Sequence, residues 1–370
     1  MRAVLLVLAV FVLLIAAGCG SSPTREQAQG GNDSGGTIGQ GDFAGNPAVG
    51  RFIARMQRQH GFDPNQLQLV LARAQKQDWI IAEMNKQAPK RSSGGVPTPT
   101  GAWTRYRAKF VTPDNIDKGV QFWSQNAAEL QRAAAKYGVP PEIIVGIIGV
   151  ETRWGRILGK TRIIDALATL SFDYPRRADY FSGELENFLV MTRDEGVDPF
   201  APRGSFAGAM GYGQFMPSAF RSYAVDLNGD GHRNLWNPAD AIGSVANYFK
   251  GHGWRTGEPV AVRATVGGGG VGGLKTGFDT SYSIATLASQ GIVAAGSTGG
   301  ADKASLLRLD VGSGFEYWLG LHNFYVITRY NHSTYYAMAV YQLGNAVKAR
   351  MTGGGRVAQS AASASADATL

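Results

Sequence analysis

The sequence has only one cysteine, Cys19, among its 370 residues. One cysteine excludes a disulfide within the chain and a zinc site of the zinc-finger type, because each needs at least two thiol groups. Blocks of lysine or arginine are also missing, and no RNA-binding or basic-zipper pattern occurs. The formal net charge of +8 favours a polyanionic partner. These absences make nucleic acid a less favoured partner, and an anionic membrane, a cell-wall polymer or a basic protein with no special partner stay open.

The cysteine directly follows a long apolar run. Residues 3–18 have the length of a signal-peptide core and are slightly short for a membrane-spanning helix. Small residues fill the three positions before Cys19, and residues 1–19 resemble a bacterial lipoprotein signal that is cleaved before a lipid-modified cysteine. Ala16 departs from the usual leucine, and an uncleaved anchor with an incidental cysteine is the alternative. The residue after the cysteine is Gly20 and not aspartate. In lipoproteins of Gram-negative bacteria this resemblance implies sorting to the outer membrane.

Composition divides the rest of the chain into a folded part and two flexible ends. The hydrophobic content of 44% is ample for a packed core, and the length favours two or three units. Residues 20–49 predict a flexible tether, and residues 351–370 predict a disordered tail. Between residues 258 and 318, valine- and threonine-rich segments alternate with glycine-rich breaks and predict a small β-rich part. Helical spacing of apolar residues begins near Arg51, and further helices are expected over 114–137, 140–154, 176–195, 239–251 and 333–350.

One glutamate lies on the apolar face of a predicted helix. Glu151 follows the apolar run of IIVGIIGVETRWG, residues 143–155, and isoleucines seven, four and three residues before it share its face. Burial raises the pKa of a carboxyl group and keeps it protonated near neutrality, as a general acid requires. The structural alternative is a buried glutamate that pairs with a base such as Arg153 or Arg156.

Two further segments combine aromatic rings with amides. In SFAGAMGYGQFMPSAF, residues 205–220, three glycines lie close to Tyr212 and Gln214, and glycine lets a ligand approach the backbone closely. In YNHSTYYAMAVYQ, residues 330–342, tyrosines and an asparagine are concentrated. Flat rings and fixed amides are typical of sugar-binding grooves. A tight turn in the first segment and a helix cap at Ser333 in the second are the structural alternatives.

The segment DLNGDGHRNLWNPAD, residues 226–240, opens like a calcium-binding loop. Position 12 of such a loop is normally a bidentate glutamate, but here it is Asn237. Asp240, three residues later, would serve in a slightly enlarged loop. A turn without metal is the alternative. The residues at positions one, three, five, six and seven are Asp226, Asn228, Asp230, Gly231 and His232.

Together these segments resemble the membrane-bound lytic murein transglycosylase B family, glycoside hydrolase family 103. The resemblance covers about residues 50–350 and rests on GVETRWG, GAMGYGQFMPS, DLNGDGHRNLWNPADAIGSVANYFKGHGW and NFYVITRYNHSTYYAMAV, in the family's order. It implies a mainly α (α+β) fold. The implied parts are a lysozyme-like helical core over 119–257 with the calcium loop, an added helical domain over 50–118 and 319–350, and a small β-rich domain over 258–318.

The resemblance also implies a lyase reaction on peptidoglycan. The family cuts the β-1,4 bond between N-acetylmuramic acid and N-acetylglucosamine and leaves a 1,6-anhydromuramic end. Ordinary glycosidases need two carboxylates, whereas the sequence offers one strong candidate, Glu151. In the family's chemistry the acetamido group and then the C6 hydroxyl of the sugar attack, so Glu151 serves alone as general acid and base.

The resemblance assigns binding roles to further residues. Core packing is the alternative for each tyrosine. Ser205, Gln214 and Tyr248 would hold the sugar near the cleavage point, Asn331, Tyr330 and Tyr336 would lie by the acetamido group, Tyr106 would line the cleft, and Arg176 and Arg177 would meet the peptide stem or lactyl carboxylate. The family's calcium ligands fall on Asp226, Asn228, Asp230, His232 and Asp240.

The implied calcium is structural, and no organic cofactor is expected. The implied partners are peptidoglycan strands, the periplasmic face of the outer membrane through a lipid on Cys19, and cell-wall synthesis proteins; no nucleic acid is expected. Two alternatives stay open. One is a hydrolysing muramidase of the same fold, and the other is a wall-binding or scaffolding lipoprotein without turnover.

Overall fold

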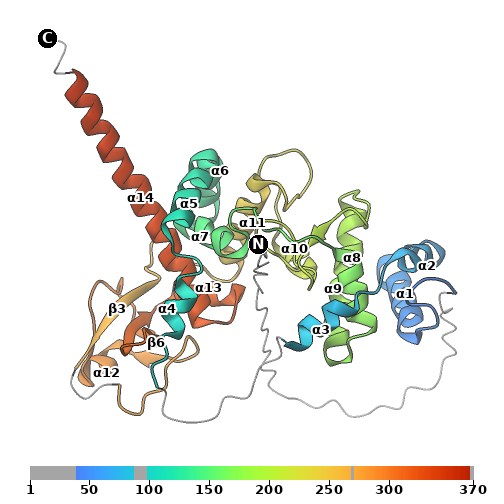
Figure 1. The fold of residues 1–370 in the computed structure, drawn as a ribbon, viewed down its shortest axis with the longest axis horizontal. Helices are drawn as coiled ribbons and strands as arrows, with labels where there is room; N and C mark the ends of the chain where they lie inside the picture. Colours follow the sequence, from blue (N-terminus) through green and yellow to red (C-terminus); the bar gives the residue numbers. More distant parts are fainter. Residues whose placement is uncertain (1–38, 87–97, 268–270, 367–370) are drawn as a thin grey trace, which may run out of the picture. The chain divides into compact units, whose positions relative to one another are not determined.

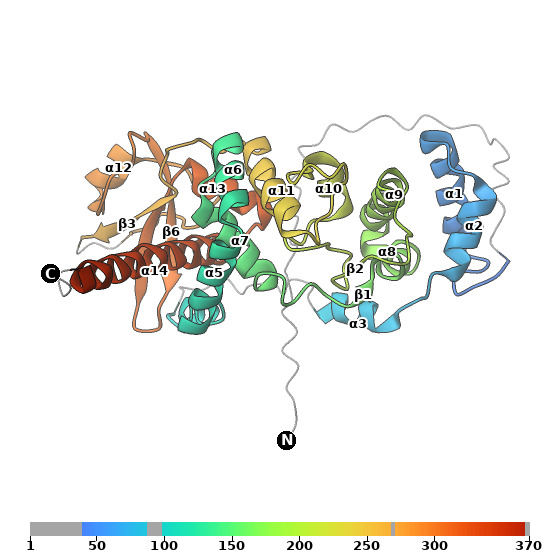
Figure 2. The same ribbon diagram turned by 90° about the horizontal axis from the view of Figure 1, so that it is seen from above.

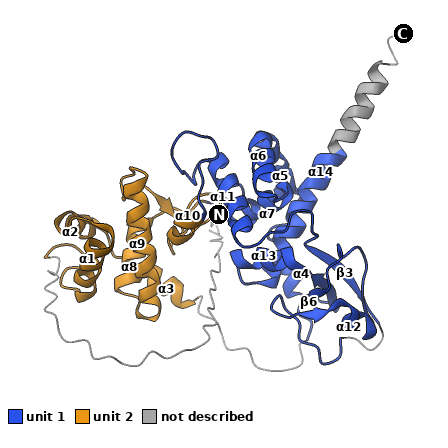
Figure 3. Cartoon of the chain, turned by 180° about the vertical axis from the view of Figure 1, so that it is seen from behind, with its two compact units in different colours: residues 1–14, 92–157, 223–370 blue, residues 15–91, 158–222 orange. Residues whose placement is uncertain are grey.

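The computed structural model describes residues 39–86, 98–267 and 271–366, with side chains through Gly353. The predicted signal, with Cys19, and most of the predicted tether lie outside these residues. The described chain forms two compact units, shown in Figure 3. Unit 1 comprises residues 98–157 and 223–366, and unit 2 comprises residues 39–86 and 158–222. This division separates 119–157 from 158–222, which the sequence analysis joined in one core, and the predicted domain boundaries stay a prediction.

Unit 1 combines a group of helices with a small sheet (Figure 1). Its helices are α4 (Ala102–Arg107), α5 (Pro113–Gln125), α6 (Ala127–Tyr137), α7 (Pro141–Thr152), α11 (Pro238–Gly251), α12 (Ile284–Ser289), α13 (His322–Tyr330) and α14 (Thr334–Ala366). Its five-stranded antiparallel sheet has the order β4-β6-β7-β3-β5. The strands are β3 (Ala261–Val266), β4 (Tyr282–Ser283), β5 (Ile292–Ala294), β6 (Lys303–Asp310) and β7 (Phe315–Gly320).

The sheet lies where the sequence predicted a β-rich part. It has its own apolar cluster, which includes Leu287 of α12 and Leu306 and Leu319 of the central strands. The glycine-rich breaks made this part recognisable because they separate its short strands. Strands β3 and β5 are rich in β-branched residues, whereas β6 and β7 contain leucine and aromatic residues instead.

Unit 2 is mainly helical (Figure 2). It contains α1 (Pro47–His60), α2 (Pro64–Arg73), α3 (Asp78–Lys86), α8 (Ile163–Phe172), the short 3-10 helix η1 (Pro175–Arg177), α9 (Ala178–Asp194) and most of α10 (Pro217–Tyr223). Its only described strands are β1 (Thr161–Arg162) and β2 (Arg203–Gly204), which pair antiparallel. Within the described residues no single helix is both long and apolar enough to span a bilayer. Helices α6 and α7 meet the length and hydropathy criteria only when they are taken together, and the angle between them is 116°.

Several helices begin with the same local device. The first residue of α1, α2, α5 and α11 is proline, and the residue before it accepts a hydrogen bond from a backbone N–H of the first turn. Proline fits there because its missing N–H would have no partner in the helix, and the preceding polar side chain satisfies another free donor. These caps fix where the helices start from information within a few residues.

Three boundaries differ from the sequence predictions. The helix expected over 114–137 is two helices, because the backbone leaves the helical region at Asn126 (φ −123°, ψ 29°). Order begins before residue 50, since Phe43 is buried against Phe172 with ring centroids 5.4 Å apart. Helix α14 continues to Ala366, into the segment that the sequence predicted to be disordered.

Helices α7 and α14 approach each other at their backbones. A Cβ atom on Gly146 of α7 would lie 2.5 Å from the Val340 carbonyl oxygen, and one on Gly344 of α14 would lie 2.0 Å from the Glu142 carbonyl oxygen. Only glycine allows such separations. The close contact runs along both helices and brings the first turns of α14 to the last turn of α7, where Glu151 lies.

Candidate active site

Glu151 occupies the last turn of α7 and is 5% exposed. Its Oε1 atom accepts a hydrogen bond from the hydroxyl of Tyr336 on α14. Its Oε2 atom is buried and has no hydrogen-bond partner among the described residues. An unpartnered buried oxygen is unfavourable unless a proton or a ligand satisfies it. The geometry thus favours a protonated carboxyl group with one oxygen available.

Burial raises the pKa of Glu151 from 4.5 to about 7, and the Tyr336 hydrogen bond opposes that rise. Burial acts because the ionised form loses its hydration, whereas the hydroxyl stabilises the ionised form. The carboxyl group is therefore poised to release and take up a proton near neutral pH, as the sequence predicted from its apolar helix face.

The backbone after Glu151 adopts a conformation that side-chain-bearing residues rarely use. Arg153 and Trp154 have positive φ angles of 52° and 56°. Their N–H groups bond back to the carbonyl oxygens of Gly149 (3.2 Å) and Ile148 (3.3 Å), and this ends the helix. The only other described non-glycine residue with positive φ is Gln214, at 52°. Such residues are held by their surroundings and gather at functional sites, and all three fall in motifs that the sequence analysis singled out.

Tyrosines surround Glu151 within unit 1. The nearby carboxyl group contributes, after burial, to raising the pKa values of Tyr106, Tyr330 and Tyr336. Tyr248 contacts Tyr330, and the centroids of the two rings lie 4.8 Å apart. The Tyr248 hydroxyl donates to the Arg329 carbonyl oxygen at 2.7 Å. The structure therefore brings together four tyrosines that the resemblance had selected.

Asn331 completes this group at the end of α13. Its side chain is buried, and its carbonyl oxygen accepts the Ser333 N–H at 2.7 Å, just before α14 begins. The loop between α13 and α14 thus holds Tyr330 and Asn331 on one side and Tyr336 on the other. This short connection explains how one sequence segment supplies three of the predicted residues.

Two aromatic neighbours of this group, Trp103 and Tyr335, had no role assigned from the sequence, although Tyr335 lies in the aromatic segment 330–342. The ring of Tyr335 lies 5.4 Å from that of Trp103 and 5.9 Å from that of Tyr106, between centroids. Trp103 and Tyr106 lie three residues apart on α4 and so share a helix face. The spacing of these two residues could have indicated an aromatic helix face. The sequence does not show that this face meets Tyr335, because Tyr335 is more than 200 residues away.

Unit 2 holds Ser205 and Gln214 in one tight loop. The Ser205 hydroxyl oxygen accepts hydrogen bonds from the N–H groups of Ala207 (3.3 Å) and Ala209 (3.0 Å). The Gln214 amide donates to the Gly211 carbonyl oxygen at 2.9 Å. Both side chains therefore stabilise the loop itself, which is the structural role that the sequence analysis kept as the alternative; a binding role stays a prediction.

Arg176 and Arg177 also belong to unit 2, in η1. The guanidinium of Arg177 lies 4.3 Å from the ring centroid of Tyr180 and 5.3 Å from that of Phe181, so part of its surface is used in cation–π contacts. Arg176 is exposed. Two adjacent cations on a surface helix turn suit an anionic group on a ligand.

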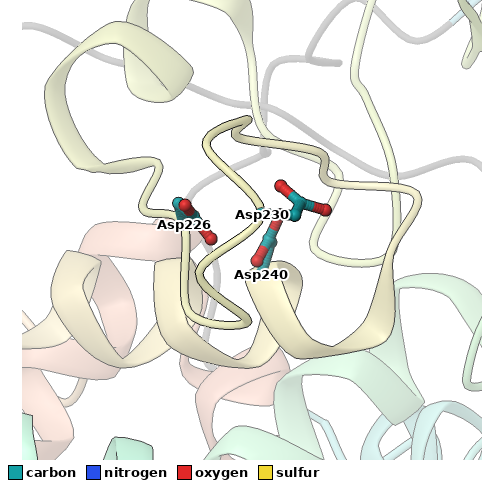
Figure 4. A group of neighbouring side chains, drawn as sticks. All are labelled: Asp226, Asp230 and Asp240. Carbon is teal, nitrogen blue, oxygen red and sulfur yellow. The ribbon is translucent and has the colours of Figure 1, made fainter.

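Three carboxylates of the 226–240 loop converge, as Figure 4 shows. Each of Asp226, Asp230 and Asp240 offers an oxygen, and these oxygens lie within 4.8 Å of one another. Calcium binds oxygen ligands at about 2.3–2.6 Å, so ligands on opposite sides of one ion lie about 5 Å apart. The carboxylates therefore fit calcium in number, type and spacing. Asn228 and His232 lie in the same loop, where the His232 N–H donates to Asp230 at 2.9 Å.

Comparison with known proteins agrees with this geometry. The transglycosylase SLT domain family matches residues 44–345. Membrane-bound lytic murein transglycosylase B of Escherichia coli (strain K12) is 58% identical over 349 residues, which cover 92% of this chain and 96% of the relative. The chain belongs to the transglycosylase SLT family. The resemblance inferred from the four segments is confirmed.

Solved structures extend the comparison. The Escherichia coli lytic transglycosylase Slt35, solved in complexes with bulgecin A and with calcium, is 61% and 60% identical to this chain. Both comparisons have a TM-score of 0.79 and cover 85% of this chain and 96% of Slt35. SltB3 of Pseudomonas aeruginosa, solved with NAG-NAM-pentapeptide, is 29% identical with a TM-score of 0.70 over 82% of this chain and 80% of SltB3. The predicted lysozyme-like, mainly α-helical fold is confirmed.

Within this transglycosylase, Glu151 differs from every other buried acid that the structure describes. The other four are Asp165, Glu184, Asp240 and Asp310. Each of them accepts hydrogen bonds at both carboxylate oxygens. Glu151 alone keeps a buried oxygen without a partner. Glu184 is also a buried glutamate, but the N–H and hydroxyl groups of Ser218 at the start of α10 bond to its two oxygens.

We expect Glu151→Gln to stabilise the protein at alkaline pH and much less at acidic pH. Because folding raises the pKa of Glu151 from 4.5 to about 7, the wild type loses stability as pH rises through this window, and ionisation at pH 8 costs about 3 kcal/mol. Glutamine cannot ionise. Urea unfolding at pH 5 and pH 8 measures the difference. Asp117→Asn, an exposed change on α5, should show no such pH dependence; equal effects of Glu151→Gln at both pH values would contradict the raised pKa.

We expect Tyr336→Phe to raise the pKa of Glu151 above about 7, because the hydroxyl that stabilises the ionised carboxylate is lost. If Glu151 is the general acid that the sequence predicts, cleavage by this variant should persist to higher pH. The alkaline limb of its kcat/KM profile should therefore shift to higher pH, even if the maximum kcat/KM also changes. Tyr341→Phe is the matched control on α14, since its hydroxyl donates to the Ala261 carbonyl oxygen instead. An unchanged or lowered limb in Tyr336→Phe would show that the hydrogen bond does not set this pKa.

Proposed function

We propose that this chain is a lytic transglycosylase that cuts the β-1,4 bond between N-acetylmuramic acid and N-acetylglucosamine in peptidoglycan and leaves 1,6-anhydromuramic ends. The observation that carries the proposal is the buried carboxyl group of Glu151, with one unpartnered oxygen and a pKa of about 7. A group of this kind is protonated often enough to act as an acid and acidic enough to act afterwards as a base.

The reaction uses one carboxyl group twice. Glu151 first gives its proton to the glycosidic oxygen, and the bond to N-acetylglucosamine breaks while the acetamido oxygen of the muramyl sugar bonds to C1. The Glu151 carboxylate then takes the proton of the C6 hydroxyl, whose oxygen attacks C1 and displaces the acetamido oxygen. No water is consumed, and Glu151 returns to its protonated state. Burial of the carboxyl group supports this route because it keeps water from the site.

The tyrosines of unit 1 support Glu151 and the sugar. In our proposal Tyr336 positions the carboxyl group through its hydrogen bond. Tyr330 and Asn331, which precede the start of α14, contact the acetamido group, and Tyr106 and Tyr248 line the cleft. Ser205 and Gln214 present the glycine-rich loop to the sugar, and Arg176 and Arg177 bind the peptide stem or lactyl carboxylate.

Calcium is proposed as a structural ion in the 226–240 loop. Its ligands would be the carboxylates of Asp226, Asp230 and Asp240, the side-chain oxygen of Asn228 and the backbone carbonyl oxygen of His232. The calcium complex of Slt35 supports the choice of ion. Bound calcium would neutralise the three carboxylates and hold the loop that leads into α11, on which Tyr248 lies. No organic cofactor is proposed.

A lipid on Cys19 is proposed to attach the enzyme to the periplasmic face of the outer membrane, where cell-wall synthesis proteins would be its neighbours. The relative from Escherichia coli is named as membrane-bound, and the apolar run before Cys19 supports a lipoprotein signal. The net charge of +8 is compatible with an anionic wall and membrane surface.

Mass spectrometry of products from purified cell wall tests the proposed reaction. The soluble form, residues 20–370, should release anhydromuropeptides, which are lighter by one water than hydrolysed muropeptides. Folded Glu151→Gln should release none. Hydrated ends from the parent would instead identify a hydrolysing muramidase. Binding to wall without product from the folded, calcium-loaded parent would favour the scaffolding alternative.

Calcium should raise the thermal midpoint of the wild type, because an ion that binds only the folded state stabilises it by mass action. We expect Asp230→Asn to lose most of this increase, since an exposed anionic ligand becomes neutral while the loop keeps its other contacts. Thermal unfolding with calcium and with a chelator measures the shift. Asp198→Asn, outside the loop, should keep the full increase; an equal increase in Asp230→Asn would argue against this ligand set.

A further inference from the structure

A cavity of about 290 Å³ in unit 1 lies outside the residues assigned above. Its wall includes Arg308 and Asp310 of β6, Phe315 of β7, Thr276, and Thr334 and Tyr335 at the start of α14. Arg308 and Asp310 are its only charged lining residues. The volume is at the small end of ligand pockets, so the cavity suits a single group of a larger ligand.

The cation in this wall has donors that the fold does not use. The guanidinium of Arg308 lies 4.9 Å from the ring centroid of Phe315, and this guanidinium forms no hydrogen bond or ion pair with the described residues. Asp310, two residues away on the same strand, does not pair with it.

The carboxylate of Asp310 forms hydrogen bonds with the residues at the start of α4. It accepts the N–H groups of Thr100, Gly101 and Ala102, the hydroxyl of Thr100 and the N–H of Gly312. These donors balance its negative charge and hold its pKa well below the usual range. Arg308 is therefore the uncompensated charge at the cavity.

The cavity adjoins the catalytic group through consecutive residues. Thr334 and Tyr335 line it, and the next residue, Tyr336, donates its hydroxyl hydrogen bond to Glu151. The ring of Tyr335 also packs against Tyr106 of the proposed cleft. The cavity and the Glu151 carboxyl group therefore both contact the first turn of α14.

We propose that this cavity binds a carboxylate of the peptide stem of the strand being cut, with Arg308 as its principal contact; this inference rests on the proposed function. A guanidinium pairs with a carboxylate through two parallel hydrogen bonds. The hydroxyl groups of Thr276 and Thr334 supply further donors. Peptidoglycan offers carboxylates in two places, on its peptide stems and, where the peptide is absent, on the lactyl group. The small volume beside a separate sugar site favours the stem, which extends away from the sugar.

The inference has a precedent in ligand type. SltB3 has been solved with a NAG-NAM-pentapeptide ligand, so a relative accommodates a stem. The position proposed here differs from Arg176 and Arg177, which belong to unit 2. A long strand carries many stems, so more than one cation can be engaged at once.

Kinetics of Arg308→Ala on two substrates test the proposal. The substrates are peptide-bearing strands and the same strands stripped of peptide by an amidase. We expect KM for peptide-bearing strands to rise about tenfold with kcat little changed, because a charge-assisted pair is lost from binding and not from the chemical step. The rise on stripped strands should stay below about threefold. Arg308→Lys keeps the positive charge but loses the planar guanidinium that forms two parallel hydrogen bonds. Its KM for peptide-bearing strands should lie between those of the wild type and Arg308→Ala.

Lys303→Ala provides the charge-matched control, since Lys303 is exposed on the same strand and does not line the cavity. It should leave KM on both substrates unchanged. A second measurement avoids turnover: in the Glu151→Gln background, Arg308→Ala should weaken binding of a peptide-bearing disaccharide about tenfold.

Equal effects of Arg308→Ala on both substrates, or no effect on either, would overturn the proposal, and a loss confined to stripped strands would assign Arg308 to the lactyl carboxylate instead. Failure of the wild type to cut either substrate would instead count against the proposed function.

Discussion

The buried carboxyl group of Glu151 is the constraint on which the organisation of unit 1 depends. An ionisable group without water is stable only if its surroundings keep it neutral or supply hydrogen bonds. Here apolar neighbours on α7 raise its pKa, and Tyr336 supplies a single hydrogen bond to one oxygen. The second oxygen has no partner in the described chain. The fold thus tolerates an unfavourable arrangement at the position where we propose that a proton is transferred.

Two features make that arrangement geometrically possible. Glycines at the crossing of α7 and α14 let the backbones approach, so that Tyr336 reaches Glu151 directly. The left-handed residues Arg153 and Trp154 then turn the chain away immediately after the acid. Asp310 adds a longer connection, because it fixes the start of α4 and so the helix that carries Tyr106. Helix packing, the backbone turn after the acid and the cap of α4 therefore all fix the surroundings of Glu151.

Much of this was predictable, and the limits have clear reasons. Glu151 could be identified because its apolar neighbours repeat at helical spacing, and the acidic loop because calcium ligands follow one another closely in sequence. The break at Asn126 was missed, since the apolar pattern continues through both α5 and α6. The tether was drawn too long because Phe43, a single aromatic residue in a polar stretch, finds its partner Phe172 far along the chain. A contact between two single residues far apart in the chain produces no periodic pattern in the sequence.

The sequence by itself determined the helix starts, the separate β-rich part, the acid on an apolar face and the family, because each depends on residues within a few positions or on long contiguous motifs. Only the tertiary structure decided which hydroxyl meets Glu151, since Tyr336 is 185 residues away. It also decided that the Asp310 carboxylate bonds to the start of α4, whereas the Arg308 guanidinium has no hydrogen-bond or ion-pair partner among the described residues. Hydrogen-bond donors and acceptors compete for one another across the whole fold, and the outcome depends on which groups burial brings together.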